Sequence, residues 1–290
     1  MNSDFDAVAS SRVNLSRSVM TDLRLGLARA LSPVIGMAVL ALLASGSDRA
    51  KAAALNDAIE RYRPYLIEGI DQALAGARDL RSKAAAHDVA GARRAWLAAR
   101  AGWERSEVFT SGFVPELDSR IDAWPDATTG FHAIEAKLFG AGTTDVAVDA
   151  DALVMYLDDL HDRLRGFPLT SQGLMDGIVR LAYEVGESKS DGGESRISGT
   201  SLEDMRNNVA GIEFAHRTLF ADSLNATDRG LAGAIDRKID ELKALVSVKD
   251  LRQVDIPKLR RTTEELVVAL QGAAARIGLK KPTLEQAQQQ

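Results

Sequence analysis

The chain contains 290 residues, and its 36 lysine and arginine residues against 41 aspartate and glutamate residues give a formal net charge of −5. A hydrophobic fraction of 46% with 27% charged residues is typical of a folded protein, and it argues against global disorder, collagen-like sequence or a polytopic membrane protein. The acidic total disfavours nucleic acid as a partner. Because the sequence contains no cysteine, disulfides, zinc–thiolate or iron–sulfur sites, a thiol nucleophile and lipid attachment through cysteine are excluded.

The first segment of the chain has the pattern of an export signal. Two arginines precede an apolar run over residues 31–44, and residues 50–52 form an A-x-A cleavage pattern. The run is shorter than the roughly 20 apolar residues that a transmembrane helix needs. We therefore expect residues 1–52 to be a signal peptide, with a start at Met20 giving it a conventional short n-region. The alternative is a buried helix of the mature domain.

After residue 52 the sequence predicts one helix after another. Alanine and leucine dominate, aromatic residues make up 5% of the chain, and the alternating β-branched runs typical of strands are missing. The predicted helices cover residues 55–86, 88–110, 129–139, 149–165, 170–185, 201–222, 227–247 and 257–277. An antiparallel helical bundle, or two bundles packed together, follows from this pattern.

Four residues are expected to mark helix ends, namely Asp88 as an N-cap, Pro257 in a first turn, and Gly140 and Gly278 as stops. The segment 186–200 is charged and rich in glycine and serine, which predicts a loop that divides the helical region into two halves. The segment 279–290 is expected to be a flexible tail.

Carboxylates interrupt the apolar faces of three predicted helices. In the helix over residues 88–110, the buried stripe of Trp96, Ala99 and Trp103 continues to Glu107, and Glu104 lies on the flank of the same face. A buried ionised carboxylate is costly unless it is paired or bound to a cation. The polar residues on this face are therefore candidates for a site.

The next two helices repeat the pattern. Glu135 lies on the apolar stripe of the helix over residues 129–139, and His132 precedes it by three residues, so that both side chains point to one side. Asp149 begins the stripe of the helix over residues 149–165. Inward carboxylates with one imidazole resemble the ligands of metal-binding helical bundles, and they suit iron, zinc or another divalent ion better than copper(I).

Each of these residues also has an ordinary structural interpretation. An isolated H-x-x-E is most often a surface ion pair, and Glu107 has Arg100 and Arg93 one and two turns away as partners. Asp149 could be an N-cap, with Asp151 as the other candidate for that cap. His216 lies on a regular apolar stripe, where a hydrogen-bonded core histidine is favoured over a ligand.

The segment from Trp124 to Gly140, WPDATTGFHAIEAKLFG, resembles the signature of the imelysin-like family, which includes the EfeO/EfeM-type periplasmic iron-uptake proteins and an alginate-binding relative. A W-E-x-x-E pattern that begins at Trp103 also matches. The resemblance covers residues 55–278, and the chain is similar to the short form without a cupredoxin domain. It implies an all-α fold of two packed antiparallel helical bundles, export to the periplasm and a metal site around the H-x-x-E motif.

Carried over residue by residue, the resemblance implies that His132 and Glu135 are metal ligands and that Asp149 is a further carboxylate ligand. Glu104 and Glu107 line the same cleft, and they are the remaining two of the expected metal-binding residues. The metal is expected to be iron, with zinc or copper as the alternatives.

A second family signature, G-E-E-x-R-Y-S-H-T-D-L-W-D-F, corresponds to residues 192–205. Glu194, Arg196, Thr200, Leu202 and Asp204 match this signature, whereas its tyrosine, histidine, tryptophan and first aspartate are absent. Glu194 and Arg196 are therefore additional candidates for cleft residues. Functions that depend on the missing residues are not carried over.

The resemblance and the inward carboxylates together predict an exported metal-binding protein that captures iron and hands it to an inner-membrane iron permease or to other periplasmic uptake components. Protonation of the ligands at low pH is expected to weaken binding. Ser47 stands where a lipoprotein would have its modified cysteine, so we expect a free periplasmic protein that is not lipidated.

Two other functions compete with metal capture. Binding of alginate or another acidic polysaccharide would need a basic surface, and the only obvious one is the stripe of Arg93, Arg94, Arg100 and Arg105, which is more typical of a solvated helix face. A metallopeptidase of the zincin type would need H-E-x-x-H, and the chain lacks both the second histidine and that glutamate. We therefore do not expect an enzyme.

Overall fold

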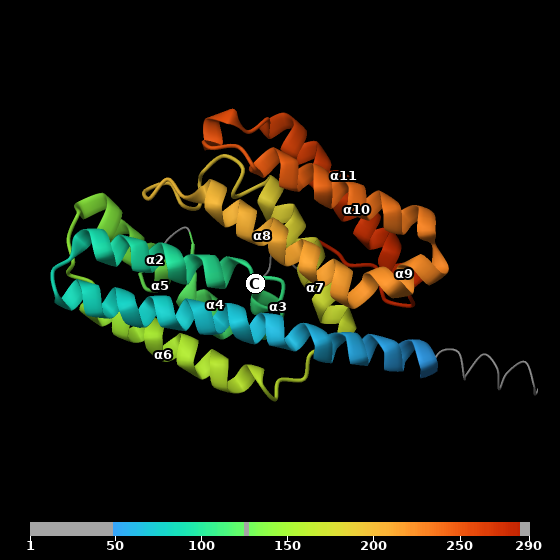
Figure 1. The fold of residues 1–290 in the computed structure, drawn as a ribbon, viewed down its shortest axis with the longest axis horizontal. Coiled ribbons are helices and arrows are strands. Elements are labelled where there is room, and N and C mark those ends of the chain that lie inside the picture. The colour runs from blue at the N-terminus through green and yellow to red at the C-terminus, as the bar shows by residue number, and fades with distance from the viewer. Residues whose placement is uncertain (1–48, 125–127, 285–290) are drawn as a thin grey trace, which may run out of the picture. The chain divides into compact units, whose positions relative to one another are not determined.

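The computed structural model describes residues 49–124 and 128–284 (Figure 1). Most of these residues are helical and none of them forms a strand, which confirms the expected all-α fold. The residues from Ala54 onward belong to one compact unit. Residues 1–48, which make up most of the expected signal peptide and include Met20, lie outside the described residues. Within the described part, every helix is too short or too polar to cross a membrane.

The helices form two packed groups, drawn from blue to green and from yellow to red in Figure 1. The first group consists of a helix over residues 49–85, α2 (Val89–Glu104), α3 (Thr110–Phe113), α4 (Pro115–Ile121), α5 (Gly130–Glu135), the π-helical turn η1 (Ala136–Ala141) and α6 (Ala147–Leu164). The second consists of α7 (Ser171–Gly186), α8 (Ser201–Ala215), the π-helical turn η2 (His216–Phe220), α9 (Ala221–Thr227), α10 (Arg229–Val246), the 3₁₀ turn η3 (Leu251–Gln253) and α11 (Ile256–Arg276). Contacts of α2 with α8 and of α3 with α7 join the groups.

The helix over residues 49–85 and α2 approach each other through small residues. A Cβ atom added to Gly76 would lie 2.6 Å from the backbone nitrogen of Ala99, so only glycine fits at this crossing. The buried Trp96 of α2 donates a hydrogen bond from Nε1 to the carbonyl oxygen of Phe131 at 3.0 Å. This bond ties α2 to α5, the helix that contains the H-x-x-E motif.

Three of the four expected helix ends are confirmed. Asp88 accepts a hydrogen bond from the backbone N–H of Gly91 at 2.8 Å, Pro257 lies in the first turn of α11, and Gly278 has a positive φ of 83°. The stop at Gly140 is wrong. The π-helical turn η1 runs through Gly140 and ends at Gly142, whose φ of 67° lies in the left-handed region that favours glycine.

The expected helix over residues 88–110 is too long. Helix α2 ends at Glu104, and Ser106 donates from Oγ to the carbonyl oxygen of Gly102 at 2.9 Å. The chain then forms the short helices α3 and α4, separated by Val114, whose φ of −138° and ψ of 52° reflect the steric restriction before Pro115. These short helices return the chain toward α5 and bring the end of α4 into the site.

Two predicted segments connect or follow the helices of the second group. The segment 187–200 joins α7 to α8. The expectation that this segment divides the helical region into two halves stays a prediction. At the start of the expected tail, the backbone N–H of Lys280 donates to Gln172 at 2.8 Å, and Gln271 donates to the carbonyl oxygen of Pro282 at 2.9 Å. Residues 285–290 lie outside the described residues.

Candidate metal centre

The geometry of the site begins with the first residue of α5. Gly130 has a φ of 72°, and a Cβ atom at this position would overlap the carbonyl oxygens of Arg120 and Ile121 at the end of α4. Because glycine allows this approach, the residue that follows α4 lies beside the first turn of α5. The Nε2 atom of His132 is 3.2 Å from Oδ1 of Asp122, and both side chains are buried.

Glu135 holds the imidazole ring of His132 in place. The two side chains lie one turn apart on α5, and Nδ1 of His132 is 3.0 Å from Oε2 of Glu135. The other carboxylate oxygen of Glu135 accepts hydrogen bonds from the backbone N–H and the hydroxyl of Ser198, at 2.7 and 2.6 Å. Nε2 of His132 finds no hydrogen-bond partner of good geometry among the described residues. A histidine held by a carboxylate at one nitrogen is the usual arrangement around a bound metal.

The two glutamates that the sequence stripe singles out lie at the end of α2 (Glu104) and in the turn that follows it (Glu107). Glu104 is fully buried and Glu107 is nearly so. Lys189, from the segment between α7 and α8, places its ammonium group between three carboxylates. Its Nζ atom lies 2.7 Å from Glu104, 3.2 Å from Glu107 and 2.9 Å from Glu194.

Arg100 is the second buried cation of the cluster, with only 1% of its surface exposed. Its guanidinium group forms ion pairs with the carboxylates of Glu104, Asp122, Glu194 and Asp204. The same group lies 5.3 Å from the centre of the Phe131 ring, within the range of a cation–π contact. Arg100 therefore connects α2 electrostatically to the chain after α4 and to α8.

Carboxylates outnumber the cations of this cluster. Six carboxyl groups, those of Glu104, Glu107, Asp122, Glu135, Glu194 and Asp204, face Arg100, Lys189 and His132. Burial raises the pKa of Glu107 well above its ordinary value, and the neighbouring Glu104 raises it further. Burial also raises the pKa of Asp204 to about 7. Because the carboxyl groups outnumber the cations, some of them keep their protons in the folded chain. A bound cation in place of these protons would also balance the negative charge.

His132 holds its proton tightly. Burial alone would lower its pKa, but the adjacent carboxylates of Asp122 and Glu135 outweigh burial and raise the pKa to about 9. Burial acts in the opposite sense on Asp122, where the nearby Arg100 and His132 nevertheless hold the pKa well below its ordinary value. At neutral pH an imidazolium therefore faces a carboxylate, and a cation that binds both groups must displace the proton of His132.

Two groups of side chains in the described part of the chain have the geometry of a metal site. Asp122, His132 and Glu194 form one group, Glu104, Glu107 and Asp122 form the other, and the candidate ligand atoms within each group lie within 4.8 Å of one another. His132 and Glu194 also line a cavity of about 400 Å³, together with Trp124, Glu135, Ala136, Gly193, Arg196 and Ile197. The first group is therefore reached from the surface.

The structure brings five of the predicted metal residues or cleft residues into one cluster, namely His132, Glu135, Glu104, Glu107 and Glu194. Asp149 lies elsewhere, in the first turn of α6, where it accepts a hydrogen bond from Nζ of Lys137 at 2.6 Å. It belongs to neither of the two groups. Arg196 is exposed and lines the cavity.

Sequence reasoning missed Asp122 and Lys189. Asp122 follows α4, a helix that the apolar pattern does not predict, and its only signal is one acidic residue between apolar neighbours. Lys189 stands among glycines and serines and has the composition of a solvated loop, yet it is 1% exposed. The expected partner of Glu107 is corrected as well, because Glu107 pairs with Lys189 and not with Arg100 or Arg93.

Two further expectations concern basic and histidine residues. The predicted basic stripe is not one solvated face, because Arg100 is buried among carboxylates and Arg93 donates two hydrogen bonds to the carbonyl oxygen of Leu138, at 2.9 and 2.7 Å. His216 is buried, as expected for a core histidine, but neither ring nitrogen has a hydrogen-bond partner among the described residues, and its Nε2 lies 3.4 Å from Asp236.

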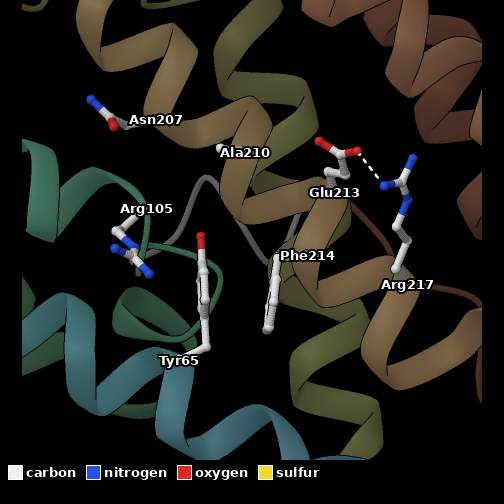
Figure 2. Close-up of a pocket in the computed structure, with 7 residues that line it drawn as sticks. All are labelled: Tyr65, Arg105, Asn207, Ala210, Glu213, Phe214 and Arg217. Carbon is white, nitrogen blue, oxygen red and sulfur yellow. Dashed lines mark ion pairs between the residues drawn. The ribbon is translucent and has the colours of Figure 1, made fainter.

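A second cavity, of about 470 Å³, lies between the helix over residues 49–85 and α8 (Figure 2). Tyr65 and Phe214 stack on each other there with ring centres 4.0 Å apart, and the guanidinium of Arg105 lies 4.3 Å from the Tyr65 ring centre. Arg217 forms an ion pair with Glu213 at 2.7 Å. Both faces of Tyr65 are therefore covered, and the arginine beside Phe214 is paired, so this cavity does not favour polysaccharide binding.

In the described residues, the fold is all-helical and encloses a buried cluster rich in carboxylates. The family model described as Imelysin, peptidase M75, matches residues 58–129 and 126–277. The chain belongs to the imelysin family.

Several relatives have names that refer to iron. The chain is 30% identical to the iron uptake system component EfeO of Yersinia pseudotuberculosis over 68% of its own length and 54% of the relative. It is 29% identical to an EfeM/EfeO family lipoprotein of Staphylococcus haemolyticus, over 67% of its length and 71% of the relative. It is also 26% identical to the iron uptake system component EfeM of Pseudomonas syringae, over 66% and 71%. The chain thus spans about half of the Yersinia protein.

The fold is similar to that of a solved structure, a protein described as an iron-regulated protein A precursor from Parabacteroides distasonis. The TM-score is 0.60 with 16% sequence identity, and the match covers 78% of this chain and 95% of the other. At this level of identity, the similarity supports the fold alone.

Proposed function

We propose that this protein is an exported component of an iron-uptake system that binds iron through Asp122, His132 and Glu194. The observation that carries the proposal is the convergence of these three side chains, of which His132 and Glu194 line a surface cavity, with His132 held by Glu135. Two carboxylates and one imidazole are a suitable ligand set for iron. The names of the EfeO and EfeM relatives support iron as the cargo.

The four residues of this site have different roles in the proposed capture. Asp122 and Glu194 supply carboxylate oxygens, and His132 supplies Nε2 after losing its proton. Glu135 orients the ring through Nδ1 and does not need to touch the metal. The sequence motif H-x-x-E is therefore interpreted as one ligand and one positioning residue.

Binding by this set requires deprotonated ligands, so it releases protons and weakens as the pH falls.

A protein that captures iron outside the cytoplasmic membrane must pass it on, and we propose an inner-membrane iron permease or another periplasmic uptake component as the recipient. We propose capture and not peptide hydrolysis, because His132 is the only histidine in the two candidate ligand groups of the described residues, whereas the zincin mechanism needs two.

Calorimetric titration with Fe²⁺ under anaerobic conditions, and with Zn²⁺ in parallel, tests the proposal. Asp122→Asn and His132→Gln are each expected to weaken the affinity at least about tenfold, because each removes one of three ligands. Asp149→Asn is the matched control, since Asp149 pairs with Lys137 outside the site, and its affinity should equal that of the unmodified chain. Equal affinities for all four proteins would refute the proposed site.

A further inference from the structure

We propose that the ammonium group of Lys189 occupies the position of a second cation in this site and thereby limits the protein to one bound metal ion. The inference rests on the proposed function for the outer position, formed by Asp122, His132 and Glu194. The inner position is formed by Glu104, Glu107 and Asp122.

The contacts of Lys189 match those of a bound ion. An ammonium group has three N–H donors, and three carboxylates accept from this one, at 2.7, 3.2 and 2.9 Å. The side chain is almost completely buried. A buried charge is stable only when it is paired and hydrogen-bonded, and here both conditions are met by acidic residues from the end of α2, from the turn that follows it and from the segment between α7 and α8.

The side chains around this ammonium would suit a metal ion if the ammonium were removed. Glu104 and Glu107, which contact the ammonium, belong with Asp122 to one group whose candidate ligand atoms lie within 4.8 Å of one another. Asn208 is completely buried and donates from Nδ2 to both glutamates at 2.8 Å. Its Oδ1 atom has no hydrogen-bond partner within the described residues. The Nδ2 group of Asn208 faces the carboxylates of the inner position, and rotation of the carboxamide would turn its oxygen, a common ligand of hard cations, toward a metal bound there.

The backbone around Lys189 is anchored, so the ammonium is a fixed part of the site. The N–H of Lys189 donates to the carbonyl oxygen of Glu184 at 3.2 Å, and the hydroxyl of Ser190 donates to that of Gly186 at 2.7 Å. Arg260 of α11 donates to the same Gly186 oxygen at 3.1 Å. The end of α7 and α11 together hold the lysine in the cluster.

Glu194 links the two positions, because it belongs to the outer ligand group and also accepts a hydrogen bond from Lys189. The lysine therefore reduces the negative charge that Glu194 offers to a metal in the outer position. Lys189 thus sets the number of bound ions and also weakens the affinity of the outer position, which favours release of the cargo.

Equilibrium dialysis of the full chain against Fe²⁺ under anaerobic conditions, followed by an iron count per chain, tests the inference. The unmodified protein is expected to bind one iron ion and Lys189→Gln two. Lys189→Arg retains the charge and should bind one. Lys137→Gln is the matched control, because it removes a lysine that pairs with a carboxylate outside the cluster, and it should also bind one.

The outcomes separate this inference from the proposed function. One ion in both the unmodified protein and Lys189→Gln, or two in both, overturns the role of Lys189 and leaves the outer site standing. If the unmodified protein binds no ion, the proposed function is overturned. The count for Lys189→Gln still tests the inner position, because one bound ion supports it and none contradicts it. If Lys189→Gln does not fold, Lys189→Ala, which removes the ammonium and keeps all the carboxylates, is counted in the same way. It should bind two ions, and a count of one contradicts the inference.

Discussion

The stability of the metal-free protein should fall as the pH rises past neutrality, because folding raises the pKa of His132. This pKa is about 9 in the folded chain against an ordinary value of 6.5. A group with a raised folded pKa contributes its full stability below the unfolded pKa and loses it as the pH passes the folded pKa. The pH window is therefore 6.5 to about 9.

The size of the effect follows from the same two values. One pKa unit corresponds to about 1.4 kcal/mol, so the shift of His132 stabilises the folded protein by about 3 kcal/mol below pH 6.5. Because about 1 kcal/mol changes the melting temperature of a domain of this size by roughly 2–4 °C, the loss amounts to roughly 6–12 °C. The side chain is 6% exposed, so solvent screening reduces this value little.

The assay is thermal unfolding of chelator-treated protein, followed by circular dichroism at several pH values in this window. The decrease should be present in the unmodified chain and in His87→Gln, which changes an exposed histidine, and should be largely absent in His132→Gln. Identical pH profiles for the unmodified chain and His132→Gln would refute the assigned pKa and its cause. Added Fe²⁺ acts in the opposite direction, since cation binding competes with the proton and strengthens as the pH rises.

Three further predictions concern stability. Arg100→Met should lower the free energy of unfolding by roughly 3–5 kcal/mol in a urea titration, because it leaves buried carboxylates unpaired; a loss below about 1 kcal/mol would contradict this role. Gly130→Ala should cost about 2 kcal/mol or more through its positive φ and overlap with the end of α4, whereas Gly166→Ala, which has open space around it, should cost much less. Asp88→Ala should cost about 1 kcal/mol through the lost N-cap, and an unchanged urea midpoint would show that the cap is not needed.

The sequence was sufficient for most of the helices because their signals are local. Asp88 caps α2 through a hydrogen bond three residues away, and Pro257 starts α11 through its own fixed φ. The helix over residues 88–110 was predicted too long because the backbone of Val114 is restricted by the following proline and the turn before it is set by packing. Gly142, and not Gly140, ends η1 because the π-helical turn adds length that no spacing rule anticipates.

The site was predictable only in its local part. His132 and Glu135 lie three residues apart, so helical spacing alone puts them together. Asp122 reaches His132 through the close approach allowed by Gly130, and Lys189 reaches Glu104 across 85 residues of sequence. Pairings of this kind depend on tertiary structure, and a loop composition rich in glycine and serine gives no sign that its lysine is buried.

Trp103 has a direct connection to the site, because its Nε1 donates a hydrogen bond to Oδ2 of Asp122 at 2.7 Å while the ring is fully buried. The emission of an indole depends on the charge next to its N–H group. A cation bound by Asp122 would therefore change the fluorescence of this tryptophan, and comparison with a Trp103→Phe variant would isolate its part of the signal. Trp103 would thus report metal binding at the proposed site, and the same signal would time the proposed capture and release without a label.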